Sequence, residues 1–143
     1  MNDEATFYDS NILVYAFDES EPLKKKKCEK LVLAVFNGRA KGIVSNQVLA
    51  EVFFILTQKV RKPISGEKAV RVVFGFLKST NWIKINYSFE TVAKAAKQTS
   101  KHKTHFWDTL IAETMLENQV FKIFTENEKD FSKIKQIKAV SPL

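Results

Sequence analysis

The chain has 143 residues, 45% of them hydrophobic and 12% aromatic, and this length and composition predict one folded domain over residues 1–143. Four Gly, three Pro and a single cysteine exclude collagen-like, disordered and disulfide-stapled proteins, and no apolar run approaches the ~18 residues of a membrane span. Lys and Arg number 23 against 16 Asp and Glu, so the net charge of +7 favours polyanionic partners such as nucleic acid. We therefore expect a protein of the cytoplasm with no membrane partner.

Short β-like runs alternate with helical patterns along the whole chain. In chain order, the predicted elements are a strand at 6–8, helices at 12–17 and 23–37, a strand at 42–45, helices at 46–62 and 65–79, a strand at 82–86, helices at 88–101 and 104–118, and strands at 121–124 and 137–140. Strands separated by helices imply parallel crossovers. The pattern therefore predicts an α/β fold with helices on both faces of a parallel sheet.

Acidic residues gather where ligands bind in such sheets, just beyond the carboxyl ends of the strands. Asp9 follows the first predicted strand, Glu51 lies in the helix after the second, and Asp108 lies near the start of the helix at 104–118. The strand ending at 124 is followed by Thr125, Glu126, Asn127, Glu128 and Asp130. Clustered carboxylates persist as anions mainly when a divalent cation neutralises them, and oxygen ligands favour Mg²⁺ or Mn²⁺.

Each of these acids also has a structural explanation. Asp9 alone could be a helix N-cap, and Asp108 alone could be a first-turn acid that complements the helix dipole. Glu51 differs because apolar residues flank it on both sides. A buried, unpaired carboxylate is strongly destabilising, so Glu51 needs a metal, a cation or a proton.

Four blocks of the chain together resemble the PIN domain family. The blocks are DSNILVYAFD at 9–18, SNQVLAEV at 45–52, FWDTLIA at 106–112 and TENEKDF at 125–131, closed by IKAVSP at 137–142. The resemblance keeps the blocks in order and covers nearly the whole chain. It implies a three-layer α/β/α fold with a central parallel sheet of four to five strands. It also implies a metal-dependent ribonuclease, and PIN proteins of this size are similar to VapC-type toxins of toxin–antitoxin pairs.

Carried over residue by residue, the resemblance implies three catalytic, metal-binding acids, Asp9, Glu51 and Asp108, and three residues that organise the site, Ser10, Asn11 and Thr125. The fourth metal-binding position stays open. Many members carry Asp two residues after the Thr, where this chain has Asn127, and Asp130 and Glu126 are the alternatives. Asn127 could coordinate through its amide oxygen but brings no charge, so either one or two metals could bind.

The basic residues just before the third acid are the expected RNA contacts, namely Lys101, Lys103 and His105. The four lysines at 24–27 point in several directions from a helix and are expected to form a solvated face. His102 with His105 could bind a metal, but without a third ligand we expect surface histidines. Phe106 and Trp107 could stack on a base, or pack in the core.

The implied activity is Mg²⁺- or Mn²⁺-dependent hydrolysis of RNA phosphodiester bonds by the toxin of a type II toxin–antitoxin pair. RNA is then the substrate and a small antitoxin protein the partner. Apolar helix faces exceed what a small core needs, so a homodimer or a partner interface is expected at some of Leu49, Phe53, Leu56, Val72, Val73 and Phe76.

Three other functions are compatible with parts of this pattern. The chain could be a catalytically idle PIN-like module that binds RNA or protein, or a housekeeping PIN nuclease. A haloacid dehalogenase-like phosphatase would also carry an Asp after the first strand, but it needs a second Asp where this chain has Asn11. The single cysteine, Cys28, is expected to be a small buried hydrophobic residue.

Overall fold

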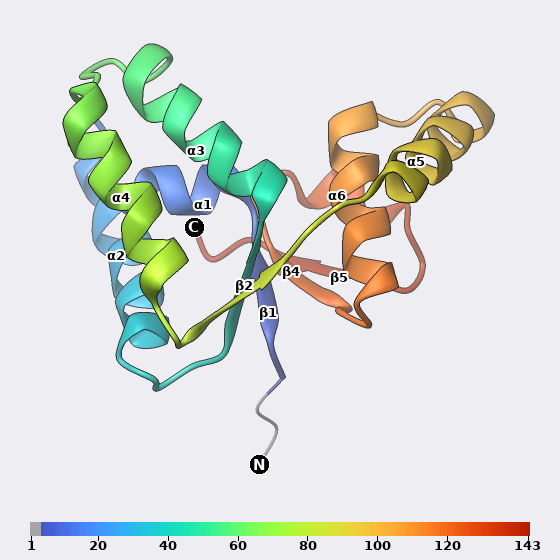
Figure 1. Ribbon diagram of the computed structural model, residues 1–143, viewed down its shortest axis with the longest axis horizontal. Helices are drawn as coiled ribbons and strands as arrows, with labels where there is room; N and C mark the ends of the chain where they lie inside the picture. Colours follow the sequence, from blue (N-terminus) through green and yellow to red (C-terminus); the bar gives the residue numbers. More distant parts are fainter. Residues whose placement is uncertain (1–3) are drawn as a thin grey trace.

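A five-stranded parallel sheet forms the centre of the computed structural model, which describes residues 4–143 (Figure 1). Its strands are β1 (Thr6–Tyr8), β2 (Gly42–Ser45), β3 (Trp82–Ile85), β4 (Lys122–Phe124) and β5 (Lys138–Val140). The order across the sheet is β3-β2-β1-β4-β5, and every neighbouring pair is parallel. The first strand of the chain is therefore the central one, and the predicted parallel sheet is confirmed.

Helices cover both faces of the sheet. They are α1 (Ser10–Tyr15), α2 (Pro22–Phe36), α3 (Asn46–Gln58), α4 (Gly66–Lys78), α5 (Phe89–His102), α6 (Phe106–Glu117) and α7 (Glu128–Ser132). Figure 1 shows α1 to α4 on one side of the sheet and α5 with α6 on the other. This arrangement confirms the predicted three-layer α/β/α fold.

Serine side chains fix where three of the helices begin. Ser45 accepts a hydrogen bond from the backbone N–H of Val48 at the start of α3. Ser65 caps α4 in the same way, and Ser88 caps α5 through a reciprocal bond with Thr91. Such caps satisfy backbone donors that have no partner within the helix. Since α3 follows β2 and α5 follows β3 closely, the caps also fix how each helix leaves the sheet.

Three helices differ from the prediction, and the first, α1, begins and ends two residues earlier than the predicted 12–17. α3 ends at Gln58 instead of residue 62, because the backbone N–H of Ile64 donates to the carbonyl of Leu56 and turns the chain back. The helix α7 occupies a segment predicted as a polar turn. Its polar residues carry no helical apolar stripe, and only Phe131 is buried within it.

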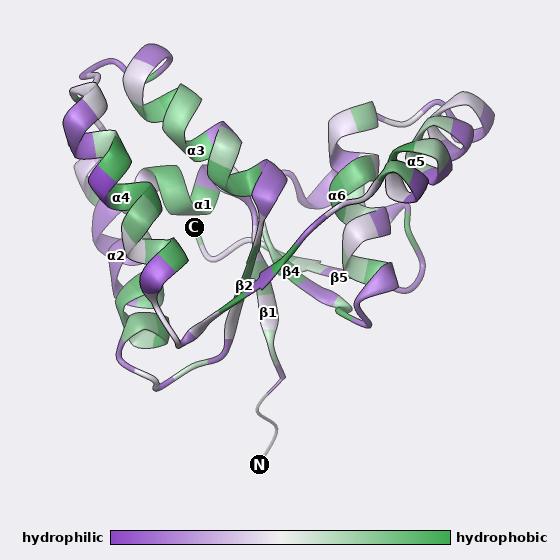
Figure 2. Ribbon diagram, viewed as in Figure 1, coloured by the Kyte–Doolittle hydropathy of each residue, from purple (hydrophilic) through white to green (hydrophobic). Residues whose placement is uncertain are grey.

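The hydrophobic core lies on both sides of β1 and contains a cluster of aromatic rings. Trp82 packs edge-on against Tyr8 and Phe76, with ring centroids 4.9 and 5.0 Å apart. α1, between the sheet and its neighbouring helices, is hydrophobic over most of its length (Figure 2). Cys28 is buried in this core, as predicted.

Two residues of the predicted apolar interface belong to the core instead. Leu56 and Phe76 are fully buried, because they lie on the faces of α3 and α4 that point toward the sheet. Phe53, on another face of α3, remains exposed. Within residues 4–143, no helix has both the length and the apolar character required to cross a membrane.

Candidate active site

Asp9 lies at the carboxyl end of the central strand, where it is the N-cap of α1. Its buried carboxylate accepts hydrogen bonds from the Ser10 backbone N–H and the Thr125 hydroxyl, each at 2.7 Å, and from the Asn11 amide at 3.4 Å. Burial raises the pKa of Asp9, while these hydrogen bonds lower it. The structure thus collects the predicted organising residues Ser10, Asn11 and Thr125 around one buried carboxylate.

Thr125 links the first and last blocks of the chain. Its hydroxyl donates to Asp9 and accepts the backbone N–H of Asn127 at 2.9 Å. The backbone N–H of Thr125 donates to Val140, and that of Asp9 donates to Phe124, both at 3.0 Å. Because these two bonds extend the strand pairing, the loop after β4 is held against Asp9 by the sheet itself.

Glu51 reaches the same edge of the sheet from the second turn of α3. Its Oε2 accepts a hydrogen bond from the Gln47 amide at 3.4 Å, whereas its buried Oε1 has no hydrogen-bond partner among the described residues. Burial and the negative charge of Asp9 raise the pKa of Glu51, while hydrogen bonding with Gln47 and with the Ser10 side chain lowers it. Glu51 is therefore a half-buried carboxylate with one oxygen free to bind.

Asp108 completes the predicted trio of acids from the first turn of α6, where it is half-buried. Burial, the negative charges of Asp9 and Asp130, and a hydrogen bond with Asp130 raise the pKa of Asp108 to about 6, while nearby His105 lowers it. Carboxylates from α1, α3, α6 and α7 therefore influence one another at this edge of the sheet. The structure brings Asp130, one of the three candidates for the fourth position, into contact with Asp108.

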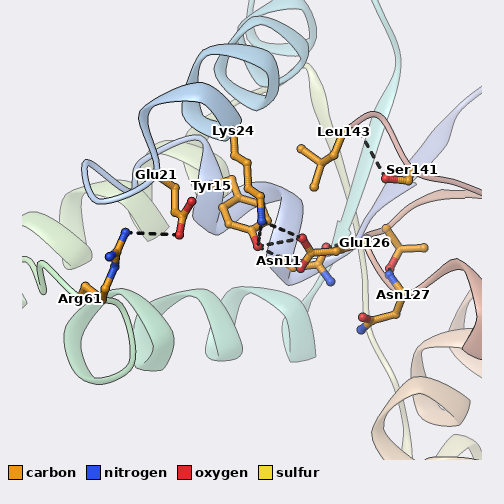
Figure 3. Close-up of polar contacts among 10 residues, drawn as sticks. Asn11, Tyr15, Glu21, Lys24, Arg61, Glu126, Asn127, Ser141 and Leu143 are labelled. Carbon is orange, nitrogen blue, oxygen red and sulfur yellow. Dashed lines mark hydrogen bonds and ion pairs between the residues drawn. The ribbon is translucent and has the colours of Figure 1, made fainter.

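Glu126, a second candidate for that position, contacts Tyr15 and Lys24 (Figure 3). Its carboxylate accepts hydrogen bonds from the Tyr15 hydroxyl at 2.8 and 2.9 Å and pairs with Lys24 at 3.3 Å. Its backbone N–H donates to the Asn11 side chain at 3.2 Å. Lys24, one of the lysines predicted to form a solvated face, keeps 40% of its side chain exposed while making this surface ion pair. Asn127, the remaining candidate, is exposed and precedes α7.

Asp9, Glu51, Asp108 and Asp130 form what we call the acidic edge of the sheet. The chemistry of this acidic edge fits a hard divalent cation. Its donors are carboxylate and amide oxygens, the ligands of Mg²⁺ and Mn²⁺. The free Oε1 of Glu51 and the raised pKa values of the three acids indicate a missing counter-charge. In the part of the chain from residue 4 onward, no three His, Cys, Asp or Glu side chains are arranged to hold a metal ion together.

The predicted RNA contacts surround the turn between α5 and α6. Lys101, Lys103 and His105 are all exposed, and His105 directly precedes α6. His102 ends α5, so it does not share a helix with His105. Phe106 is partly buried and Trp107 is exposed, and their rings meet edge-on at 5.1 Å.

Three residues near the acids were not predicted from the sequence. Gln47 lies one helical turn before Glu51, so its contact could have been found from the (i, i+4) spacing. Tyr15 and Lys24 contact Glu126 across more than 100 positions, and no sequence pattern indicates that pairing.

An apolar groove of about 350 Å³ lies between α3 and α4. It is lined by Leu49, Ala50, Phe53, Val70, Val73 and Phe74. Three of the residues predicted for an interface, Leu49, Phe53 and Val73, are therefore found in one surface depression.

Comparison with known proteins gives one family and several related structures. The PIN domain family model matches residues 6–137, and no curated protein sequence matches the chain. One solved structure with a similar fold is the toxin VapC20 of Mycobacterium tuberculosis, which cleaves the sarcin-ricin loop. Its sequence is 15% identical to this chain, and the two structures align with a TM-score of 0.69. The alignment covers 91% of this chain and 95% of VapC20. At this identity the likeness shows the fold alone.

Two further structures share that fold. A toxin–antitoxin complex from Klebsiella pneumoniae is 18% identical to the chain, and VapBC2 of Rickettsia felis, bound to a DNA fragment from its promoter, is 20% identical. Each has a TM-score of 0.64 and an alignment over 96% of this chain and 98% of the other.

Proposed function

The chain belongs to the PIN domain family, as its sequence blocks predicted, and on that premise we propose that it is an endoribonuclease dependent on Mg²⁺ or Mn²⁺. The observation that carries this proposal is the convergence of Asp9, Glu51 and Asp108 at the carboxyl edge of the sheet, each with a raised pKa. Ionised carboxylates held this close need a positive partner, and a cation at this edge would supply one.

The proposed roles follow from how each side chain is held. Asp9 and Asp108 would be direct metal ligands, and Asp130 or Asn127 would lie in the outer shell. A bound divalent cation lowers the pKa of a coordinated water and offsets charge on the departing oxygen of the phosphodiester. The free Oε1 of Glu51 can accept a hydrogen bond from the attacking water, so Glu51 would act as a ligand or as the orienting base.

RNA would approach over the turn between α5 and α6. Exposed Lys101, Lys103 and His105 lie close before Asp108 in the chain, and they would contact backbone phosphates on either side of the cleaved bond. The net charge of +7 supports a polyanionic substrate.

We further propose that the protein is the toxin of a type II toxin–antitoxin pair and acts in the cytoplasm. The toxin and toxin–antitoxin structures with the same fold support this proposal. A small antitoxin would cover the acidic edge, and the apolar groove between α3 and α4 offers a surface for it or for a second copy in a homodimer. A housekeeping PIN nuclease would use the same site without an antitoxin.

One observation favours a second candidate, a catalytically idle PIN-like module that binds RNA or protein. Asn127 stands where many family members carry an acid, and its neighbour Glu126 is engaged with Tyr15 and Lys24. An idle module would bind RNA equally well with and without a divalent cation. A nuclease would need the cation for turnover.

Cleavage of a labelled, structured RNA tests the proposal directly. We expect the purified protein to cut with Mn²⁺ or Mg²⁺ and to stop when EDTA is added, because the carboxylates alone lack the required positive charge. Asn127→Asp should increase the rate if this position supplies the fourth ligand. Absence of cutting with either metal, together with RNA binding that EDTA does not change, would instead support the idle module.

Thermal unfolding with and without Mn²⁺ gives a test that does not depend on the RNA chosen. The raised pKa of Asp108, about 6, means that the folded state binds more protons than the unfolded state between pH 4 and 6. Stability conferred by this group therefore falls as pH rises through that window. At pH 7.5, where the acids are ionised, saturating Mn²⁺ should raise Tm by about 5 °C or more.

At pH 5 the shift with Mn²⁺ should be much smaller, since protons compete for the same oxygens. Glu126→Gln is the matched control, because that carboxylate faces Tyr15 and Lys24, and it should keep the full shift. An equal shift at both pH values would argue against binding at these carboxylates.

A further inference from the structure

Trp107 is a large apolar side chain displayed on the surface beside the acidic edge. Its side chain is 61% exposed in the first turn of α6, immediately before Asp108. The other tryptophan, Trp82, is 1% exposed and packed among aromatic rings of the core. An exposed indole contributes little to the stability of the fold, so its position calls for another explanation.

The backbone at Trp107 is anchored although the side chain is exposed. The backbone carbonyl of Trp107 accepts a hydrogen bond at 3.1 Å from the amide of Gln47, which is buried. The same amide nitrogen donates to the Glu51 carboxylate, so Gln47 links the backbone of Trp107 to Glu51. On its other side, the ring meets Phe106 edge-on at 5.1 Å. With its backbone anchored, the indole has few side-chain torsions left to order on binding, so the cost in conformational entropy is small.

The surroundings of Trp107 suit a nucleic acid. Exposed Lys101, Lys103 and His105 precede it within six residues, and positive groups of this kind contact phosphates. The start of α3 also holds a second aromatic segment, since Asn46 accepts the backbone N–H of Tyr87 at 3.2 Å, next to Gln47. Phe89, two residues further on, is 92% exposed. Exposed aromatic and basic residues therefore occur together in the chain segments next to Glu51 and Asp108.

We infer that Trp107 is a stacking platform for an unpaired base of the RNA, adjacent to the phosphate that is cleaved. The inference rests on the proposed ribonuclease function and specifies its substrate as RNA with an unstacked base at that point. Bases within a duplex are stacked on each other and do not offer a face to a side chain, whereas bases in loops and single strands do. Every base has such a face, so the platform discriminates strandedness more than sequence.

RNA binding without cleavage tests the inference separately from the proposed function. The binding experiment uses the full chain carrying Asp108→Asn, in EDTA, with a fluorescent single-stranded oligoribonucleotide and a duplex that contains it. Fluorescence anisotropy should show tighter binding of the single strand. Adding Trp107→Ala should weaken single-strand binding roughly 10- to 100-fold, while Trp107→Phe should stay within a few-fold, because a phenyl ring still stacks.

Phe121→Ala is the matched control. Phe121 is also exposed, at 45%, but it lies before β4, at the opposite edge of the sheet, so its loss should leave RNA binding unchanged. Intrinsic fluorescence provides a second measurement. Since Trp82 is buried, quenching by unlabelled single-stranded RNA should come from Trp107 and should vanish in Trp107→Phe.

The inference would be overturned if Trp107→Ala and Phe121→Ala bound RNA equally well and RNA did not quench the fluorescence of the parent protein. Exposed Trp107 would then be explained as a contact for a partner protein. Preference for the duplex would overturn it as well. Failure of the wild-type protein to cut any RNA with Mn²⁺ would count against the nuclease function only, because the binding measurement needs no turnover.

Discussion

Asp9→Asn is expected to lower the rate of RNA cleavage by at least ~100-fold while the protein stays folded. Asparagine has nearly the same shape, and its one remaining oxygen can still accept a hydrogen bond from Ser10 or Thr125. The substitution removes the negative charge that would hold the cation. Because burial raises the pKa of Asp9, losing the charge also relieves a desolvation penalty, so Tm should be unchanged or higher.

Single-turnover cleavage with Mn²⁺ and thermal unfolding, measured on the same preparation, check both parts of this prediction. Glu126→Gln is the matched control, since it makes the same chemical change at the carboxylate that pairs with Tyr15 and Lys24, and its cleavage rate should stay within about threefold. Undiminished cleavage by Asp9→Asn would remove Asp9 from the proposed metal site. A large fall in Tm would show that the carboxylate is mainly structural.

Gly42→Ala is expected to have the second large effect, a destabilisation of the fold by about 1 to 3 kcal/mol. Gly42 begins β2, and a Cβ there would lie 2.6 Å from a ring carbon of Trp82 and 2.8 to 2.9 Å from the methyl groups of Val35. Both neighbours are buried in the core, so neither can move without disturbing others. Urea unfolding followed by far-UV circular dichroism measures the change.

Gly75→Ala gives the opposite expectation from the same chemical change. Gly75 lies inside α4, and no atom stands within 4 Å of a Cβ built there. Alanine should therefore stabilise the helix by roughly 0.5 to 1 kcal/mol. Neither variant touches the acidic edge, so the folded fraction of each should cleave RNA at the parental rate. Equal stability of the two variants would contradict the tight packing around Gly42.

The strands and most helices could be predicted because local sequence determines them. A β-branched or aromatic run followed by a capping serine, as at 42–45, gives the end of a strand and the start of a helix together. The helix α7 could not be predicted, because its stability depends on the docking of Phe131 rather than on its own pattern. The same limit applies to Leu56 and Phe76, whose burial depends on which helix face meets the sheet.

The general position of the candidate site could also be predicted, because residues that follow parallel strands lie together at the carboxyl edge of the sheet. That rule places Asp9, Glu51 and Asp108 together from the sequence alone. It could not separate Glu126 from Asp130, because the two lie only four positions apart in one polar segment. Tertiary partners separate them, as Glu126 meets Tyr15 while Asp130 meets Asp108.

The position of β1 at the centre of the sheet has a consequence for the order of events during synthesis. β2 can pair with β1 early, but β4 must pair on its other side, and the bond between Thr125 and Asp9 spans 116 positions. Contacts this distant in sequence form late, because the loop between them must first close. A growing chain that already carries Asp9, Glu51 and Asp108 therefore lacks an ordered site while it is still on the ribosome. For the proposed ribonuclease, we expect that nascent chains cannot cut nearby RNA until synthesis has passed β4.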